Sequence, residues 1–393
     1  EIDPAQWNRL TGGNPFLRHE FLHALHETGC ASEKTGWTPR YLATFDRSEL
    51  TGAMPLYIKS HSRGEYVFDW AWADAYHRHG LEYYPKLLCA IPFTPVSGPR
   101  ILGASADVIE ELACKVLEIA RESNASSLHC LFPPAEQTQL FKQKGMMVRH
   151  GVQFHWQHPG EGVADFEQYL ACMNHAKRKK IRQERRKVVE AGITFRWLEG
   201  PAISEDDWSF FARCYTRTYR EHHNTPYLSE AFFQRIGKTM PENLLLIVAE
   251  RAGKPIAASF NVRGYAHGAY GAYGAHGGRL YGRYWGAIEH HPMLHFEACY
   301  YQTIEYCLAR GIEVFEGGAQ GEHKMARGLL PVQTSSVHWL AHPQFAEAVE
   351  LFLQQRRHRL IRHVARRDGR ARLVIRLPST PLPSPSMRPR AWR

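Results

Sequence analysis

The sequence predicts an α/β protein with mixed sheets, built from two similar halves. At 393 residues the chain is too long for one small core, so two domains are expected. A helix–strand–loop step at residues 105–134 is matched by a second step at 294–324, and strand patterns precede each. Strands followed by strand–helix–strand, twice over, indicate a duplicated α/β unit.

The first domain is expected at 1–157. Two runs of alternating apolar and polar residues around Asp46-Arg47-Ser48-Glu49 are typical of a hairpin. Ser105 is a suitable N-cap for a helix, because apolar residues recur behind it at helical spacing. The predicted strands are 39–45, 51–59, 65–70, 126–132 and 146–156, and the predicted helices are 105–122 and 134–144.

The second domain is expected at 163–365, after a Pro- and Gly-containing linker at 158–162. Gly192 is a natural C-cap, and Ser204 and Ser229 open further helices. The predicted helices include 166–190, 294–310 and 343–365, and the predicted strands are 193–198, 244–250, 254–262, glycine-rich aromatic strands within 266–286, 312–315 and 335–340. Residues 366–393, rich in Arg, Pro and Ser, are predicted to be disordered.

The net charge of +10 is concentrated rather than spread over the protein. Residues 354–393 contain twelve Arg and one Asp, so the remainder is close to neutral. A second basic run at 177–187 is open to three interpretations: a solvated helix face, a dock for a phosphate-rich donor, or contact with an anionic membrane. The charge therefore does not indicate a nucleic-acid-binding face spanning the molecule.

The eight cysteines are scattered and include no CxxC pair, which favours reduced thiols. The longest aliphatic run, 244–249, is far shorter than a membrane span, and no charged-then-apolar leader opens the sequence. We therefore expect a cytoplasmic protein, with any membrane contact peripheral and at the inner face.

A glycine-rich segment at 315–328 is the most informative stretch of the chain. A predicted apolar strand runs directly into two acids, a histidine, a lysine and an arginine. Glycines let the backbone turn sharply and approach a ligand, and ligands bind at strand ends in open α/β sheets. An ordinary polar turn is the alternative. The candidate residues here are Glu316, Gly317, Gly318, Gln320, His323, Lys324 and Arg327.

Several strings resemble the FemAB-like (peptidoglycan biosynthesis/recognition) branch of the GNAT N-acyltransferase superfamily. They lie between about residue 14 and residue 350. They include Asn14-Pro15-Phe16-Leu17, Gly64 to Asp74, Tyr83 to Leu87, Pro92 to Val96, Lys179 to Lys187, Tyr281 to Gly286, His295 to Glu297 with Cys299 to Gln302, and the glycine-rich segment. The resemblance implies two fused GNAT-like domains with a site in the cleft between them, walled mostly by the second.

The resemblance also implies an enzyme that moves an acyl group to a primary amine. The expected donor is a thioester, acyl-CoA or acyl carrier protein, used as co-substrate with no permanently bound cofactor. The acceptor could be a lipid or sphingoid amine. The alternatives are an aminoacyl-tRNA-dependent transferase acting on a peptidoglycan precursor in the cell envelope, and a recognition module without chemistry. Arg283-Tyr284-Trp285-Gly286 matches the GNAT pyrophosphate motif only as far as its glycine, so the sequence does not establish CoA as donor.

Acyl transfer to an amine needs a base, a stabilised oxyanion and a proton for the leaving group. Glu316 is the candidate base, with an ion pair to Lys324 or Arg283 as the alternative. His323 and Tyr284 are candidate proton carriers. Arg283, Lys324 and Arg327 are candidate anion-binding groups. Glu297 and Tyr301 share one predicted helix face and either line the site or complement the helix dipole.

In the first half, acids alternate with aromatic residues between 68 and 76. Asp69, Trp72 and Asp74 are candidates for receiving an amine through charge and cation–π contact, with a solvated edge strand as the alternative. Lys86 is a candidate for binding an anionic head group. No metal site is expected: His291 and His295 are four apart, but Pro292 interrupts the turn between them.

Overall fold

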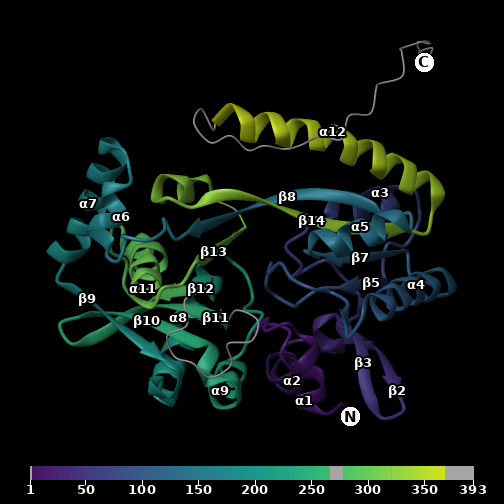
Figure 1. Ribbon diagram of the computed structural model, residues 1–393, viewed down its shortest axis with the longest axis horizontal. Helices are drawn as coiled ribbons and strands as arrows, with labels where there is room; N and C mark the ends of the chain where they lie inside the picture. The colour runs from purple at the N-terminus through teal and green to yellow at the C-terminus, as the bar shows by residue number, and fades with distance from the viewer. Residues whose placement is uncertain (1, 266–277, 320, 368–393) are drawn as a thin grey trace.

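The computed structural model describes residues 2–265, 278–319 and 321–367, which form a mixed α/β structure (Figure 1). The strands of its large sheet are β1 (Trp37–Pro39), β4 (Tyr57–Lys59), β5 (Lys86–Cys89), β7 (Ser127–Leu131), β8 (Met147–Gln157), β9 (Ile193–Glu199), β10 (Leu244–Arg251), β11 (Lys254–Tyr265), β12 (Gly278–Ala287), β13 (Val314–Ala319) and β14 (Leu330–Leu340). A small sheet contains β2 (Leu42–Asp46), β3 (Glu49–Met54) and β6 (Leu102–Gly103).

The helices pack around these sheets. They are α1 (Pro4–Leu10), α2 (His19–Glu27), α3 (Trp70–Arg78), α4 (Ala106–Glu122), α5 (Ala135–Gln143), α6 (Phe166–Ala171), α7 (His175–Glu190), α8 (Glu205–Glu221), α9 (Glu230–Thr239), α10 (Leu294–Phe296), α11 (Gln302–Arg310) and α12 (Pro343–Arg367). A π-helical turn, Glu297–Tyr301, joins α10 to α11, and a 3₁₀ turn, η5 (Glu322–Arg327), precedes β14.

The strand order of the large sheet is β1-β4-β5-β7-β14-β8-β13-β12-β11-β10-β9. Within the described residues, β5 with β7 and β12 with β13 are its parallel pairs, and every other pairing is antiparallel. One parallel pair lies in each half, and a helix connects the two strands of each. The mixed sheet and the repeated step predicted from the sequence are both confirmed.

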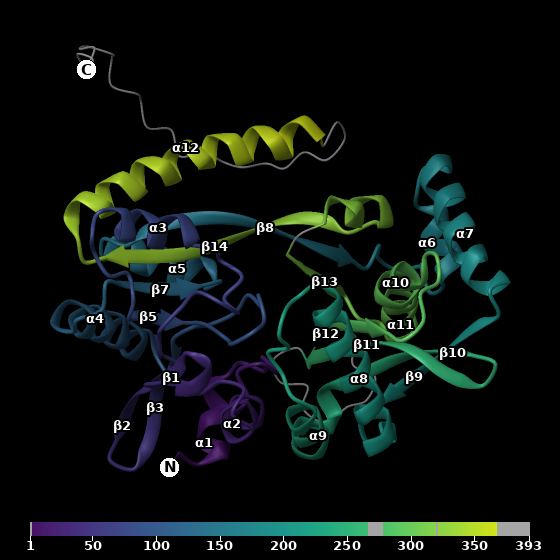
Figure 2. The ribbon, with the colours of Figure 1, turned by 180° about the vertical axis from the view of Figure 1, so that it is seen from behind.

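The two halves are interlocked rather than simply joined. β14 comes from the end of the second half, yet it lies between β7 and β8 of the first. In return, α1 and α2 contribute to a core shared with the second half, where the ring of Phe21 meets that of Phe232 edge to face at 5.5 Å. The sequence can therefore be divided into two halves near residue 160, but the large sheet cannot be divided at the same point. Figure 2 shows α12 crossing the molecule above β8 and β14.

Several local predictions were wrong. Residues 65–70 form no strand, because Gly64 (φ 82°) and Tyr66 (φ 63°) have left-handed backbone, which ends an extended run before α3 begins. The predicted strand 51–59 is divided between β3 and β4, and the helix 166–190 between α6 and α7, where Asn174 caps α7 by accepting a hydrogen bond from the Lys177 N–H at 3.0 Å. The short strand β5 was not predicted.

Candidate functional site

A cavity of about 440 Å³ opens where the parallel strands β12 and β13 separate. These strands pair over three residues, ending with Tyr281 opposite Glu316. Beyond that point β13 keeps its pairing with β8, whereas β12 continues beside β11. The cavity is lined by Gly64, Tyr66, Phe68, Phe93 and Pro95 of the first half and by Tyr219, Asn224, Tyr227, Gly282, Arg283, Tyr284, Gly317, Gly318 and Lys324 of the second.

The two glycines that follow Glu316 are needed where they stand. Gly318 has φ 75°, a backbone conformation that disfavours other residues. A Cβ atom at Gly317 would lie 2.4 Å from a methyl carbon of Leu329. The glycine pair thus brings the backbone close to the cavity, as the sequence indicated.

Arg283 is a buried cation in the cavity wall, with a side chain that is 2% exposed. Its Nη1 donates to the carbonyl of Gly282 at 3.0 Å and its Nη2 to Glu316 Oε2 at 3.4 Å. Its Nε has no hydrogen-bond partner within the described residues. Burial lowers the pKa of Arg283, but a guanidinium remains protonated in proteins. A buried N–H without a partner is costly, so an acceptor atom supplied by a ligand would be favourable here.

Lys324 is the second buried cation of the wall and lies on η5. Its Nζ donates to the carbonyls of Gly317 at 2.6 Å and Gly318 at 3.3 Å. Burial, together with the charge of Arg283, lowers the pKa of Lys324 to about 8. The side chain therefore loses its proton within the range in which many enzymes work.

Glu316 is fully buried on β13 but is not among the residues that line the cavity. Arg279 donates to its Oε1 at 2.6 Å, and Arg283 approaches its Oε2 at 3.4 Å. The alternative considered for this residue, an ion pair with Arg283, is therefore present, with Arg279 as an additional partner. A carboxylate held between two guanidinium groups is well placed to fix Arg283 and poorly placed to accept a proton from a substrate.

Glu297, Tyr301 and Arg327 lie in a separate cluster that fastens α7 to the rest of the second half. The hydroxyl of Tyr301 donates to Glu184 of α7, and Arg327 Nη2 donates to both oxygens of the same carboxylate at 2.9 and 2.8 Å. Arg185 pairs with Glu297 at 3.0 Å. None of the three lines the cavity, because their side chains are committed to α7.

His323 belongs to the same side of η5 and also lies outside the cavity lining. Its Nε2 is 3.2 Å from the hydroxyl of Tyr300, and its ring lies 5.5 Å from that of Phe296. Gln320, another candidate of this segment, is outside the described residues. Among the described residues that line the cavity, Lys324 is thus the one charged residue that comes from the predicted segment 320–327.

Tyr284 lines the cavity and connects the halves, because its hydroxyl donates to the carbonyl of Phe93 at 2.7 Å. Burial raises the pKa of Tyr284 well above its usual value. The run from Arg283 to Gly286 lies within β12, where Gly286 pairs with Ala258 of β11. It does not form a loop at a helix N-terminus, so it lacks the geometry of a pyrophosphate-binding motif.

Asp69 and Lys86 form a buried ionic cluster behind the cavity rather than a substrate site. Lys86 is fully buried, and its Nζ lies 2.8 Å from Glu65 Oε2 and 2.5 Å from Asp69 Oδ2. Tyr83 donates to Asp69 at 2.7 Å. Glu65 and Asp69 flank Tyr66 and Phe68, which line the cavity, so the cluster holds this loop in place. The expected contact of Lys86 with an anionic head group is inconsistent with its burial.

Trp72 and Asp74 lie on α3, not on the edge strand considered for them. Trp72 is buried with its ring 5.0 Å from that of His338, and Asp74 is on the surface, paired with Arg78. Neither lines the cavity. His291 contacts Glu289 and His295 packs on Trp285, and no group of possible metal ligands occurs within the described part of the chain.

Nine cavity residues were not among the site residues predicted from the sequence: Gly64, Tyr66, Phe68, Phe93, Pro95, Tyr219, Asn224, Tyr227 and Gly282. Tyr66 and Phe93 both have a φ of 63°, unusual for aromatic residues. Sequence patterns do not reveal such strain. For Tyr219, Asn224 and Tyr227, the clustering of tyrosines between 215 and 227 was the one available signal in the sequence.

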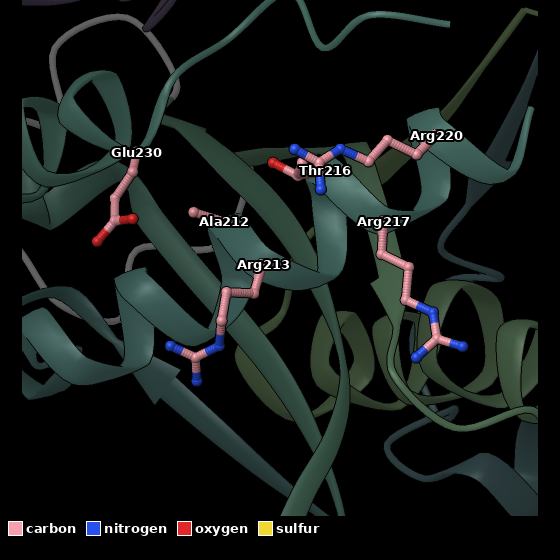
Figure 3. Close-up of a pocket in the computed structure, with 6 residues that line it drawn as sticks. All are labelled: Ala212, Arg213, Thr216, Arg217, Arg220 and Glu230. Carbon is pink, nitrogen blue, oxygen red and sulfur yellow. The ribbon is translucent and has the colours of Figure 1, made fainter. Parts of the chain in front are cut away.

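A second cavity of about 440 Å³ lies on the outer face of α8 (Figure 3). Arg213, Arg217 and Arg220 line it, and all three are exposed. Arg217 pairs with Glu221 and donates to the carbonyl of Ile288, both at 2.8 Å. Water and salt screen such exposed charges. These arginines therefore attract an anion more weakly than the buried cations of the first cavity.

The basic run 177–187 forms most of α7, whose buried face consists of Ile181, Glu184 and Val188. The outer face carries exposed cations: Lys177, Lys179, Lys180, Arg182, Arg186 and Lys187. Its charge is therefore presented to solvent on a helix that stands at the edge of the molecule (Figure 1). Among the described residues, no helix is both long enough and apolar enough to cross a bilayer.

The family model described as FemAB-like, peptidoglycan biosynthesis/recognition, matches residues 1–371. The chain belongs to the FemAB-like family. No curated protein sequence matches it. Among solved structures, FemX has a TM-score of 0.51 at 11% identity, covering 89% of this chain and 99% of its own. L-PGS from Bacillus licheniformis has a TM-score of 0.53 at 12% identity, covering 90% and 98%. These likenesses establish the fold of the FemAB-like chain.

We predict that replacing Lys86 by Met lowers the free energy of unfolding by about 3–5 kcal/mol, because two buried carboxylates lose their partner. Urea denaturation measures this change. The control Lys115→Met removes an exposed pair with Glu118 and should change the free energy of unfolding far less. Adding Glu65→Gln and Asp69→Asn to Lys86→Met should restore much of the loss. A loss as small as that of the control would show that the cluster does not hold the loop.

Proposed function

We propose that this FemAB-like protein is an N-acyltransferase that moves an acyl group directly to a primary amine. The observation that supports this most is the cavity between the halves, where an aromatic wall meets the two buried cations Arg283 and Lys324. Such a cavity suits a ligand with an apolar part and a centre of negative charge. Its volume lies within the range of small-molecule sites, and its two walls come from different halves.

The reaction places negative charge on the carbonyl oxygen of the donor. The amine nitrogen forms a bond to the carbonyl carbon, and the oxygen becomes an oxyanion. When the carbonyl re-forms, the bond to the leaving group breaks, and the nitrogen gives up a proton that balances the departing anion. Protonated Lys324 is positioned to stabilise the oxyanion, because it is buried and its charge is little screened.

The attacking amine must be neutral, since an ammonium has no free electron pair. The described residues that line the cavity include no carboxylate. Two buried cations nearby lower the pKa of a bound ammonium, so an amine that enters tends to lose its proton to water. We propose on this ground that the acceptor is deprotonated as it binds, and that Glu316 positions Arg283 rather than acting as the base.

We propose a thioester, acyl-CoA or acyl carrier protein, as the donor. A thioester carries an activated carbonyl whose thiolate leaves readily, so it places little demand on an acid catalyst. This fits a wall in which the buried hydroxyl of Tyr284 is already bonded to a carbonyl oxygen. The apolar side chains of Phe68, Phe93 and Pro95 offer a surface for the acyl chain.

The pH dependence of transfer tests the role of Lys324. Below about pH 8 the lysine is protonated, and above it the oxyanion loses its stabilising charge. In the wild type, kcat/KM should therefore fall about tenfold per pH unit above pH 8, after correction for titration of the acceptor. In Lys324→Arg the fall should move beyond about pH 10, because guanidinium stays charged. Transfer from acyl-CoA to a primary amine is followed by release of the thiol. Superimposable pH profiles of the wild type and Lys324→Arg would show that Lys324 does not stabilise the oxyanion.

Replacing Glu316 by Gln is expected to reduce kcat/KM by about 10² or more while the protein still folds. If Glu316 positions Arg283, kcat/KM should fall by a similar factor at every pH; if Glu316 is the base, the loss should be largest where the acceptor is protonated and smallest where it is already neutral. Circular dichroism of the variant provides the folding control. Turnover like that of the wild type would remove Glu316 from both roles, and failure of the wild type to transfer from any donor would favour a recognition module.

An aminoacyl-tRNA donor is the second candidate, supported by the exposed cations of α7 and by the likeness to FemX. If it is correct, tRNA binding weakens steeply with salt. Replacing Lys179, Arg182 and Arg186 by Gln should reduce the slope of log affinity against log salt by about 0.7–0.9 per lost contact. Replacing Arg213, Arg217 and Arg220 of α8 removes the same charge elsewhere and should leave the slope unchanged. Equal effects of both triple variants would indicate nonspecific attraction.

A further inference from the structure

We propose that the acceptor amine carries an anionic group, a carboxylate or phosphate close to its nitrogen, and that Arg283 binds this group. The inference rests on the proposed acyl transfer and adds to it the chemical class of acceptor. It separates amino-acid-like and phosphate-bearing amines from simple alkylamines.

Arg283 has unmet hydrogen-bonding capacity. Its Nε donor is buried without a partner in the described part of the chain, and its bond to Glu316 is long, at 3.4 Å. Its guanidinium lies 5.2 Å from the ring centre of Phe16 and 5.1 Å from that of Tyr281. These contacts hold the plane of the group while leaving a donor for a ligand. Arginine in such a setting favours carboxylate and phosphate oxygens.

The charges around the cavity are positive. Both charged side chains among its described lining residues are cations, and the neighbouring acid, Glu316, is already bound by Arg279 and Arg283. A simple alkylammonium would meet repulsion and no compensating carboxylate. An acceptor with its own anion would bring the missing negative charge, so its binding is favourable in a site where charges are weakly screened.

The two cations of the cavity lie on either side of Gly318. Lys324 Nζ donates to the carbonyl of Gly318 at 3.3 Å, and a Cβ at Gly318 would lie 3.9 Å from Arg283 Nη1. The same glycine therefore lies beside both groups, and its lack of a side chain leaves the space between them free. One cation can serve the reacting carbonyl while the other holds a fixed anion a few atoms away.

The cavity on α8 provides an internal comparison. Its three arginines are exposed, and Figure 3 shows the guanidinium groups of Arg213 and Arg217 pointing in different directions. Arg217 is paired with an acid of its own helix. An arginine of this kind contributes little to anion selectivity, and Arg217→Gln is therefore the matched control for Arg283→Gln.

The test uses two compounds that mimic the product, N-dodecanoylglycine and its neutral amide, N-dodecanoylglycinamide. Isothermal titration calorimetry of the full chain should give an affinity about tenfold or more higher for the carboxylate compound. Arg283→Gln should abolish this preference, Arg283→Lys should retain part of it, and Arg217→Gln should leave it intact. Binding of 4′-phosphopantetheine is measured in parallel to detect an anion site for the donor.

Equal affinity of the wild type for the two dodecanoyl compounds would overturn the inference, whatever the variants do. The inference would also be overturned if Arg283→Gln weakened the binding of 4′-phosphopantetheine but left the binding of N-dodecanoylglycine unchanged. If acyl transfer to some amine is observed alongside either result, the proposed function survives and only the acceptor class is wrong. If neither dodecanoyl compound binds and no amine is acylated, both the inference and the proposed function fail.

Discussion

The candidate site depends on a buried carboxylate at the point where two parallel strands part. Glu316 is the last residue of β13 that pairs with β12, and it is fully buried between Arg279 and Arg283. A guanidinium can be buried in an aromatic wall only if a nearby charge compensates its desolvation. Glu316 supplies that charge from the side away from the cavity. Arg283 is thereby fixed at the wall with donor capacity to spare, and the strand separation provides the space in front of it.

The exchange of elements between the halves supports this wall from both sides. The loop that carries Lys324 begins at the end of β13 in the second half and continues within a few residues into β14, which is paired on both edges by strands of the first half. The loop that carries Tyr66 and Phe68 is held from behind by Lys86. Neither half alone would complete the cavity. Both halves are therefore needed for the cavity although, among the described residues, one parallel strand pair opens onto it.

The sequence predicted what depends on local pattern and missed what depends on distant pairing. Arg283, Tyr284, the two glycines and Lys324 were identified because they lie in or beside strands with recognisable periods. His323 and Arg327 were assigned to the same site because they are neighbours of Lys324, but in the tight 3₁₀ turn Arg327 binds Glu184 of α7 and His323 contacts Tyr300. Lys86 was predicted to bind a ligand because its actual partners, Glu65 and Asp69, lie seventeen or more residues away in the sequence. Those partners belong to a segment with left-handed backbone, and the sequence pattern did not indicate that conformation. The paired backbone of β12 likewise showed why a fragment of a phosphate-binding motif need not bind phosphate.

The two candidate donors make the same demands on the cavity and different demands on the surface. A thioester and an aminoacyl ester both present an activated carbonyl to an amine, so Lys324 and Arg283 could serve either one. They differ in the body attached to that carbonyl: a nucleotide or small protein in one case, a folded polyanion in the other. The part of the molecule that would sense the difference is α7, whose outer face is cationic and whose inner face is tied through Glu184 to Arg327, three residues from Lys324. A change of donor within this fold could therefore proceed by altering one exposed helix face, while the buried charges at the strand separation stay as they are.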